Sequence, residues 1–197
     1  MAELWSTPSP GLEVGTTAAQ ILTLPEQVQW YALYTRFRYE KQVAAMLTYR
    51  EVEYYLPLYE AMHRWKDRNA RVQLPLFPSY IFVRLDLQDR MRALTIPGVI
   101  RLVGSKHPEP LSSEEVEAIK SYLSCRLPVE PYPYLTQGTR VRIVCGPLAG
   151  MEGLILRRKS TCRIVINLDL IQRSMLVEVA AADVEYLGAA VPHLAAA

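Results

Sequence analysis

Apolar side chains in the first two thirds of the chain alternate with polar ones in some segments and recur at helical spacing in others. Residues 30–35 and 80–85 follow the short period of strands, and 80–85 is the strongest strand signal in the chain. Residues 39–50 instead place apolar side chains three and four positions apart, as in a helix with one buried face. A second helix is predicted to begin at Ser112, because Glu115 three residues later completes a capping box.

A long hairpin is predicted between the first helix and the strongest strand. Residues 57–64 and 71–74 flank the polar stretch 65–70, which has the composition of a hairpin tip. Strands and helices in this order predict an α+β fold, in which helices pack against an antiparallel sheet.

The predicted strand at 80–85 is apolar on both of its sides. Tyr80 and Phe82 are two residues apart and therefore share one face, opposite Ile81 and Val83. We expect the helices to cover one of these apolar faces. The other face requires a cover beyond these helices.

The last third of the chain has a different pattern of apolar residues. Short β-rich runs, separated by turn or charged residues, occur at 141–143, 153–156, 163–166, 175–179 and 184–187. Five short strands in about fifty residues are typical of a small β-barrel.

Composition divides the chain into five segments. Residues 1–29 and 189–197 mix small and turn-forming residues without a period, which is typical of a flexible leader and tail. Three prolines near the start of 128–136 oppose both helix and central strand and predict an extended linker. The predicted domains are therefore 30–127 and 137–188.

Charge and cysteine content narrow the classes of protein. Residues 30–127 carry 15 basic and 11 acidic side chains, a mild excess that suits contact with nucleic acid or an acidic protein. The three cysteines are widely spaced and form no Cys-x-x-Cys pair, so neither a metal site nor a disulfide framework is expected. The sequence lacks a signal peptide and a long apolar run, so we expect a cytoplasmic protein without a membrane span.

Candidate chemistry is sparse. The three histidines are isolated in sequence, and no nucleophile elbow or His-Glu-x-x-His motif occurs. We therefore expect no catalytic residues, no cofactor and no enzyme activity. The alternative, an enzyme, requires a constellation of titratable groups that sequence spacing does not reveal.

Glycines in the last third carry a more specific signal. The run Gly138-Thr-Arg-Val-Arg-Ile-Val-Cys-Gly-Pro-Leu-Ala-Gly-Met-Glu-Gly153 places glycines where short strands turn tightly, but it lacks the Gly-Lys-Ser/Thr ending of a nucleotide-binding loop. This run resembles a KOW motif, the signature of small SH3-like barrels in transcription and ribosomal proteins.

The first domain decides among proteins that carry a KOW barrel. Trp30-Tyr31, the segment Pro75-Leu-Phe-Pro-Ser-Tyr-Ile-Phe-Val83 and Thr95-Ile-Pro-Gly-Val99 together resemble the N-terminal domain of the NusG family of transcription elongation factors. The spacing of these segments and the basic hairpin are similar to specialised antitermination paralogues of the RfaH and UpxY type. Ser79 departs from the pattern, because the general elongation factor usually has Gly there.

The resemblance implies a site for RNA polymerase. Tyr34, Phe77, Tyr80 and Phe82 match the pocket with which the family docks onto the clamp helices of the polymerase β′ subunit, from where the domain reaches toward the β lobe. As single residues, these aromatics could equally form a core cluster. The KOW barrel is expected to tether a second partner, such as a ribosomal protein or a termination factor.

The resemblance also implies a contact with the non-template DNA strand of the transcription bubble. Arg36 and the first helix match the DNA-contacting region of the specialised paralogues, and Arg38, Lys41 and Arg50 lie nearby in sequence. Phosphate contacts from such residues give affinity without sequence preference. A solvated helix face explains the same residues equally well. The hairpin charges Arg64, Lys66, Arg68 and Arg71 are an alternative contact or a solvated tip.

The predicted function is that of an operon-specific transcription elongation or antitermination factor. A general NusG-type elongation factor is one alternative, and a ribosome-associated or RNA-binding KOW protein is another. The latter class has no need of Trp30-Tyr31 or of the aromatic residues between 77 and 82.

Overall fold

The computed structural model describes residues 28–65, 68–158 and 161–189. The predicted leader up to residue 27, the hairpin residue Lys66 and the tail from residue 190 lie outside these ranges. The side chains of residues 63–70, which include the predicted hairpin contacts Arg64 and Arg68, are likewise not among those described.

An antiparallel sheet organises the first domain, and we call it the N-terminal sheet. Its strands are β1 (Val28–Thr35), β2 (Glu53–Tyr55), β5 (Tyr80–Asp86), β6 (Val99–Leu102) and β7 (Pro110–Leu111). The strand order is β2-β5-β1-β6, and β7 also pairs with β1. The two strands with the clearest sequence signals, β1 and β5, lie side by side at its centre, with Leu33 opposite Ile81 and Ala32 opposite Phe82.

The two faces of the N-terminal sheet have different covers. Helices α1 (Glu40–Tyr49) and α2 (Met91–Leu94) cover the face that carries Ile81 and Val83, and Val43 and Leu47 of α1 are fully buried there. Helix α3 (Ser113–Ser124) covers the opposite face, which carries Phe82. Both faces are therefore covered, as predicted, but the second face is packed against α3 and not only against something beyond the helices.

Helix α3 begins at the predicted position, but only one of the two side-chain hydrogen bonds of the predicted capping box forms. Ser112 is the N-cap residue, and its side chain makes no capping hydrogen bond. The Glu115 carboxylate instead accepts a hydrogen bond from the Ser112 backbone N–H. Burial raises the pKa of Glu115, the nearby Asp169 raises it further, and this hydrogen bond opposes both effects.

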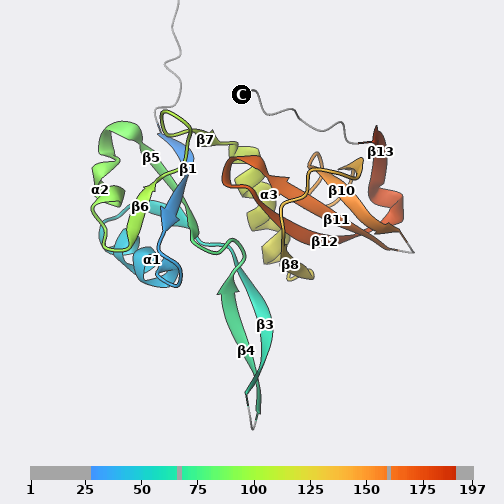
Figure 1. Ribbon diagram of the computed structural model, residues 1–197, viewed down its shortest axis with the longest axis horizontal. Helices are drawn as coiled ribbons and strands as arrows, with labels where there is room; N and C mark the ends of the chain where they lie inside the picture. The colour runs from blue at the N-terminus through green and yellow to red at the C-terminus, as the bar shows by residue number, and fades with distance from the viewer. Residues whose placement is uncertain (1–27, 66–67, 159–160, 190–197) are drawn as a thin grey trace, which may run out of the picture.

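The predicted hairpin consists of β3 (Leu58–Trp65) and β4 (Arg68–Pro75), and it projects away from both sheets of the molecule (Figure 1). Near its base, Arg71 forms an exposed ion pair with Glu60 at 3.9 Å.

A second antiparallel sheet, which we call the C-terminal sheet, contains β8 (Val129–Tyr132), β9 (Thr139–Ile143), β10 (Glu152–Arg158), β11 (Thr161–Leu168), β12 (Arg173–Ala180) and β13 (Val184–Ala189). Its order is β13-β9-β10-β11-β12-β8. Short 3₁₀ turns are η1 (Leu87–Asp89), η2 (Asp169–Ile171) and η3 (Ala181–Asp183). The fold is thus the predicted α+β domain followed by a small β domain.

Strand β8 was not predicted, because it lies in the proline-rich segment 128–136. The segment is extended, as expected, but it pairs with β12, where Pro131 lies opposite Met175. Proline is tolerated there because β8 is the edge of the sheet and pairs on one side only.

Helix α3 lies between the N-terminal sheet and the C-terminal sheet (Figure 1). One continuous apolar cluster runs from Trp30 and Phe82 through Val116 and Ile119 of α3 to C-terminal residues such as Ile164. The two sheets therefore share a core with α3 at its centre.

Candidate functional site

The four aromatic residues predicted to bind polymerase come together, and we call them the aromatic patch (Tyr34, Phe77, Tyr80 and Phe82). Tyr34 of β1 pairs with Tyr80 of β5, and their ring centroids are 5.3 Å apart. The rings of Phe77 and Phe82 are 5.9 Å apart.

Accessibility divides the patch into two pairs. Phe77 and Phe82 are 1% and 0% exposed, because they belong to the apolar cluster that also contains α3. Tyr34 and Tyr80 are half-buried. The expected exposed aromatic surface is thus reduced, in this arrangement, to the two tyrosines.

The C-terminal sheet reaches the patch through η2 and the start of β12. The guanidinium carbon of Arg173 lies 5.9 Å from the Tyr80 ring centroid, and that of Arg101 lies 5.9 Å from the Tyr34 centroid. Both distances are within the range of a cation–π contact. A cavity of about 480 Å³ lies beside Tyr80, lined from both domains by residues that include Arg101, Asp169 and Arg173.

Tyr55 extends the patch, although β2 was not among the strands predicted from the sequence. The Tyr55 ring centroid is 6.4 Å from that of Phe82. The ammonium group of Lys120, on α3, lies 5.5 Å from the Tyr55 ring centroid and is also within cation–π range of the Trp30 ring. Burial raises the pKa of Tyr55 to about 12, and the charge of Glu117 adds to this shift. The available signal was the pair of β-favouring tyrosines after Glu53, although alternation breaks at this pair.

Ser79 adopts a backbone conformation that ordinarily favours glycine. Its φ is 71°, in the left-handed region that a side chain disfavours. The Ser79 N–H donates a hydrogen bond to Glu40 Oε1 at 2.7 Å, and Glu40 is only 3% exposed. The Ser79 carbonyl in turn accepts from the Thr35 N–H. This buried carboxylate fixes the turn before β5, and sequence patterns did not reveal it.

Two of the predicted DNA-binding residues lie in a tight turn between β1 and α1, which we call the arginine turn (residues 36–39). Its backbone is fixed by two hydrogen bonds, from the Arg36 N–H to the Gly98 carbonyl at 2.8 Å and from the Tyr39 N–H to the Arg36 carbonyl at 3.1 Å. Arg38 has a φ of 69°.

The other two predicted DNA-binding residues are engaged elsewhere. Lys41 Nζ donates to the Gln73 carbonyl at the base of the hairpin, at 2.8 Å. Arg50, at the far end of α1, donates to the Arg92 carbonyl at 2.8 Å and to Thr95 Oγ1. The four basic residues therefore do not form one cluster, and among them Arg36 and Arg38 make no such bond to any residue that the structure describes.

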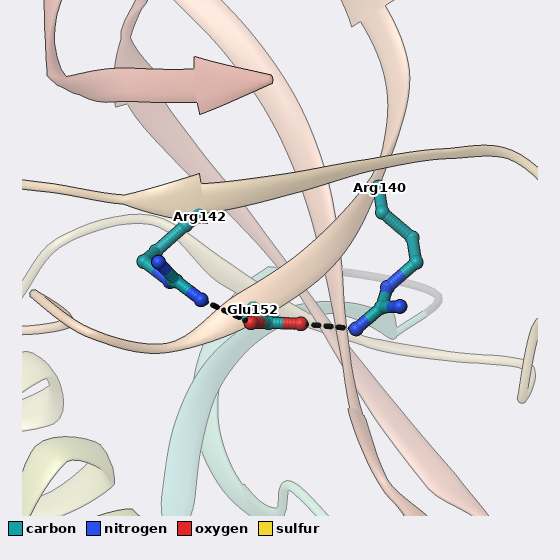
Figure 2. Close-up of polar contacts among 3 residues, drawn as sticks. All are labelled: Arg140, Arg142 and Glu152. Atoms are coloured by element: carbon teal, nitrogen blue, oxygen red, sulfur yellow. Dashed lines mark hydrogen bonds and ion pairs between the residues drawn. The ribbon is translucent and has the colours of Figure 1, made fainter. Parts of the chain in front are cut away.

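In the C-terminal sheet, Glu152 bridges two arginines of the predicted KOW motif (Figure 2). Its Oε1 accepts from Arg142 at 2.7 Å, and its Oε2 accepts from Arg140. These hydrogen bonds lower the pKa of Glu152. The carboxylate thus partly neutralises what would otherwise be a basic pair on β9.

Within the described ranges, no group of three or more His, Cys, Asp and Glu residues is placed to hold a metal ion. No helix in the described part of the chain is both long and apolar enough to cross a membrane. Cys125 and Cys145 are exposed, and Cys162 is buried as a free thiol.

Comparisons with known proteins point to one family. The family model described as "NusG: Transcription termination factor nusG" matches residues 28–120. The transcription termination/antitermination protein NusG of Helicobacter pylori J99 is 27% identical over 124 residues, which cover 61% of this chain and 70% of the relative. The protein of the same name from Thermus thermophilus is 28% identical over 149 residues, which cover 65% and 81%.

A solved structure described as "Domain interaction in Thermotoga maritima NusG" matches with a TM-score of 0.56 and 19% identity. The match covers 81% of this chain and 97% of that one. At this level of identity the likeness concerns the fold.

Proposed function

Since the chain belongs to the NusG family, we propose that it is an operon-specific transcription elongation and antitermination factor acting on RNA polymerase in the cytoplasm. The aromatic patch docks onto the clamp helices of the β′ subunit, and the domain reaches toward the β lobe. The observation that carries this proposal is the pair of half-buried tyrosines, Tyr34 and Tyr80, at the open end of an otherwise buried aromatic cluster. The role involves no catalysis.

The proposed mechanism is selective binding to one state of the polymerase. A protein that bridges the two sides of the DNA channel binds the closed clamp better than the open one and so lowers the population of the paused state. The shift cannot exceed the difference in affinity between the two states.

Docking through the whole patch requires the C-terminal sheet to move. Phe77 and Phe82 are inside the shared core, and Arg173 lies over the Tyr80 ring. The arrangement described above is therefore the closed state of the proposed factor, and polymerase binds the open one. The released C-terminal sheet is then available to a ribosomal protein or a termination factor.

The operon-specific interpretation draws on Ser79 and on the arginine turn. Ser79 occupies a left-handed position where the general factor usually has glycine, and Glu40 holds it there. Arg36 and Arg38 are free to contact the non-template strand. A general elongation factor is the alternative, and it requires no sequence preference in that contact.

The test removes the contact between Tyr80 and Arg173 in two separate variants, one for each residue. Tyr80→Ala removes a docking side chain and should weaken binding of the full chain to isolated β′ clamp helices by about tenfold or more, as for other central interface aromatics. Arg173→Ala removes the same contact but frees the ring, so the affinity should rise by about two- to fivefold.

Tyr49→Ala, which removes an 83% exposed aromatic ring at the end of α1, is the matched control and should change nothing. The measurement is the dissociation constant from titration calorimetry, with circular dichroism to verify the fold. Equal affinity of the Tyr80 and Arg173 variants and the unaltered chain would refute docking through this patch.

A further inference from the structure

Phe37 stands apart from the other phenylalanines of the chain. There are three in the sequence, and two of them, Phe77 and Phe82, are essentially inaccessible. Phe37 is 64% exposed, on the arginine turn. A single exposed apolar side chain is common on protein surfaces, so the meaning of Phe37 depends on its surroundings.

The turn presents Phe37 on a fixed backbone. Arg36, directly before it, and Tyr39, two residues after it, are held by the hydrogen bonds to Gly98 and Arg36 described above. Gly98 has a φ of 96°. A Cβ at this position would come within 2.7 Å of the Tyr39 ring, so the turn packs closely against the backbone at Gly98. The ring of Phe37 is therefore directed outward by a rigid support.

The surroundings of Phe37 are positively charged. Neither the Arg36 nor the Arg38 guanidinium takes part in a hydrogen bond or ion pair within the described part of the chain, and Arg38 lies 5.4 Å from the Phe37 ring. The one carboxylate between residues 36 and 49, Glu40, is buried and bound to the Ser79 N–H. An exposed ring that follows Arg36 in the chain and has the Arg38 guanidinium over it is complementary to a ligand with a planar apolar face and negative charges on both sides.

We infer that Phe37 is a stacking platform for an unpaired base of single-stranded DNA, with Arg36 and Arg38 contacting the phosphates that flank this base. Single-stranded nucleic acid offers open base faces, whereas the bases of a duplex are already stacked on one another. The site rests on the proposed function in that the open transcription bubble supplies such a strand. It adds an aromatic contact that the basic residues alone do not provide.

The two kinds of contact have different salt dependence, which makes the inference testable. Phosphate contacts release counterions and set the slope of log affinity against log salt. Stacking on an aromatic ring depends little on salt and is commonly worth about tenfold or more in affinity for each base.

The experiment uses the full chain and a fluorescent single-stranded DNA of about 12 nucleotides, with the same sequence as a duplex for comparison. Anisotropy titrations are made at two salt concentrations. We expect Phe37→Ala to weaken single-strand binding by about tenfold at both salt concentrations, with an unchanged slope and little effect on the duplex. Phe37→Trp, which retains a stacking surface, should restore the affinity.

Variants of the two arginines test the proposed phosphate contacts. Arg36→Ala and Arg38→Asn should reduce the salt slope, and asparagine is chosen because it tolerates the positive φ of residue 38. Tyr49→Ala, which removes an aromatic side chain on α1 outside the turn, should bind as the unaltered chain does.

Three results would overturn the inference: no single-strand binding by the unaltered chain, no loss with Phe37→Ala, or an equal loss for single strand and duplex. Binding of the same variants to clamp helices separates this site from the proposed polymerase contact. Phe37→Ala should leave that affinity unchanged, and a failure of the clamp-helix test leaves the DNA titration fully interpretable.

Discussion

The aromatic patch and the arginine turn meet at the end of β1, yet they differ in what covers them. Tyr34 is the last residue of the patch on this strand, and the turn begins at Arg36, after Thr35. The Phe77 and Phe82 rings lie within a core that continues into the C-terminal sheet, whereas Phe37 is mostly exposed. Two surfaces a few residues apart thus differ in their accessibility in the same structure.

The difference arises from the local structure of the two segments. Side chains on the face of a sheet need a second layer, and here α3 and the C-terminal sheet provide it. A turn at the end of a strand has no such layer above it. In the proposed function, the arginine turn can therefore contact DNA while the aromatic patch is still covered, and polymerase docking follows the opening of the domains.

The largest expected effect contrasts one phenylalanine from each region. Phe82→Ala leaves a cavity in the shared core and should lower the free energy of unfolding by about 3–5 kcal/mol. Phe37→Ala should change it by less than about 0.5 kcal/mol, because the ring is exposed. Urea unfolding followed by circular dichroism measures both, and similar losses in the two variants would contradict the difference in cover.

Glu40 lies at the junction of the two regions, and its loss should affect both. Glu40→Ala removes the acceptor of the buried Ser79 N–H, which should cost about 1–3 kcal/mol of stability. Because the turn before β5 positions Tyr80, the variant should also weaken clamp-helix binding. Glu40→Gln retains an acceptor and should recover most of the stability; a glutamine variant as unstable as the alanine one would argue for a different role of this side chain.

A substitution of Ser79 tests the same junction. We expect it to change the stability of the fold less than the Glu40 variant does, and in the opposite direction. Ser79→Gly relieves a side chain at positive φ and should stabilise the fold by about 1 kcal/mol. The Glu40 hydrogen bond uses the backbone N–H and is retained in the variant. A thermal melt gives the answer, and a lower melting temperature for the glycine variant would mean that the serine hydroxyl contributes a stabilising contact.

The smallest effect concerns the Glu152 bridge, remote from both regions. The folded state lowers the pKa of Glu152, so the bridge stabilises the fold above the unfolded-state pKa, and this contribution is lost as pH falls through the lower folded-state value. Since all three side chains are partly exposed, the contribution should be small. Glu152→Gln should therefore be slightly less stable at pH 7 and equal to the unaltered chain in strong acid. A difference that persists in acid would exclude the ion pairs as its cause.

Alternation and helical spacing predicted much of the fold. They placed β1, β5 and α1 within a few residues and put Tyr80 and Phe82 on one face. They could not show that Phe82 is inaccessible, because its cover comes from residues far away in sequence. Strand β8 was missed for a related reason, since proline opposes a central strand but is compatible with an edge.

The predicted DNA-binding residues show a second limit of sequence patterns. Spacing along a helix indicates which face a lysine or arginine occupies, but not which backbone carbonyl lies opposite. Lys41 and Arg50 each find such a carbonyl, at Gln73 and Arg92. Phe37 did carry a readable signal, as an apolar residue between two arginines just before a helix.

The short connection between α3 and β8 limits how far the two domains can separate. Only residues 125–128 join these elements, and even fully extended they span roughly 17 Å. As long as β8 stays paired with β12, the C-terminal sheet remains tethered beside the surface it covers, and its local concentration there is on the order of millimolar. Recapture is then an intramolecular competition that does not depend on protein concentration. In the proposed function, polymerase has to compete with this tethered sheet for the aromatic patch, so its apparent affinity for the full chain is lower than for the uncovered patch.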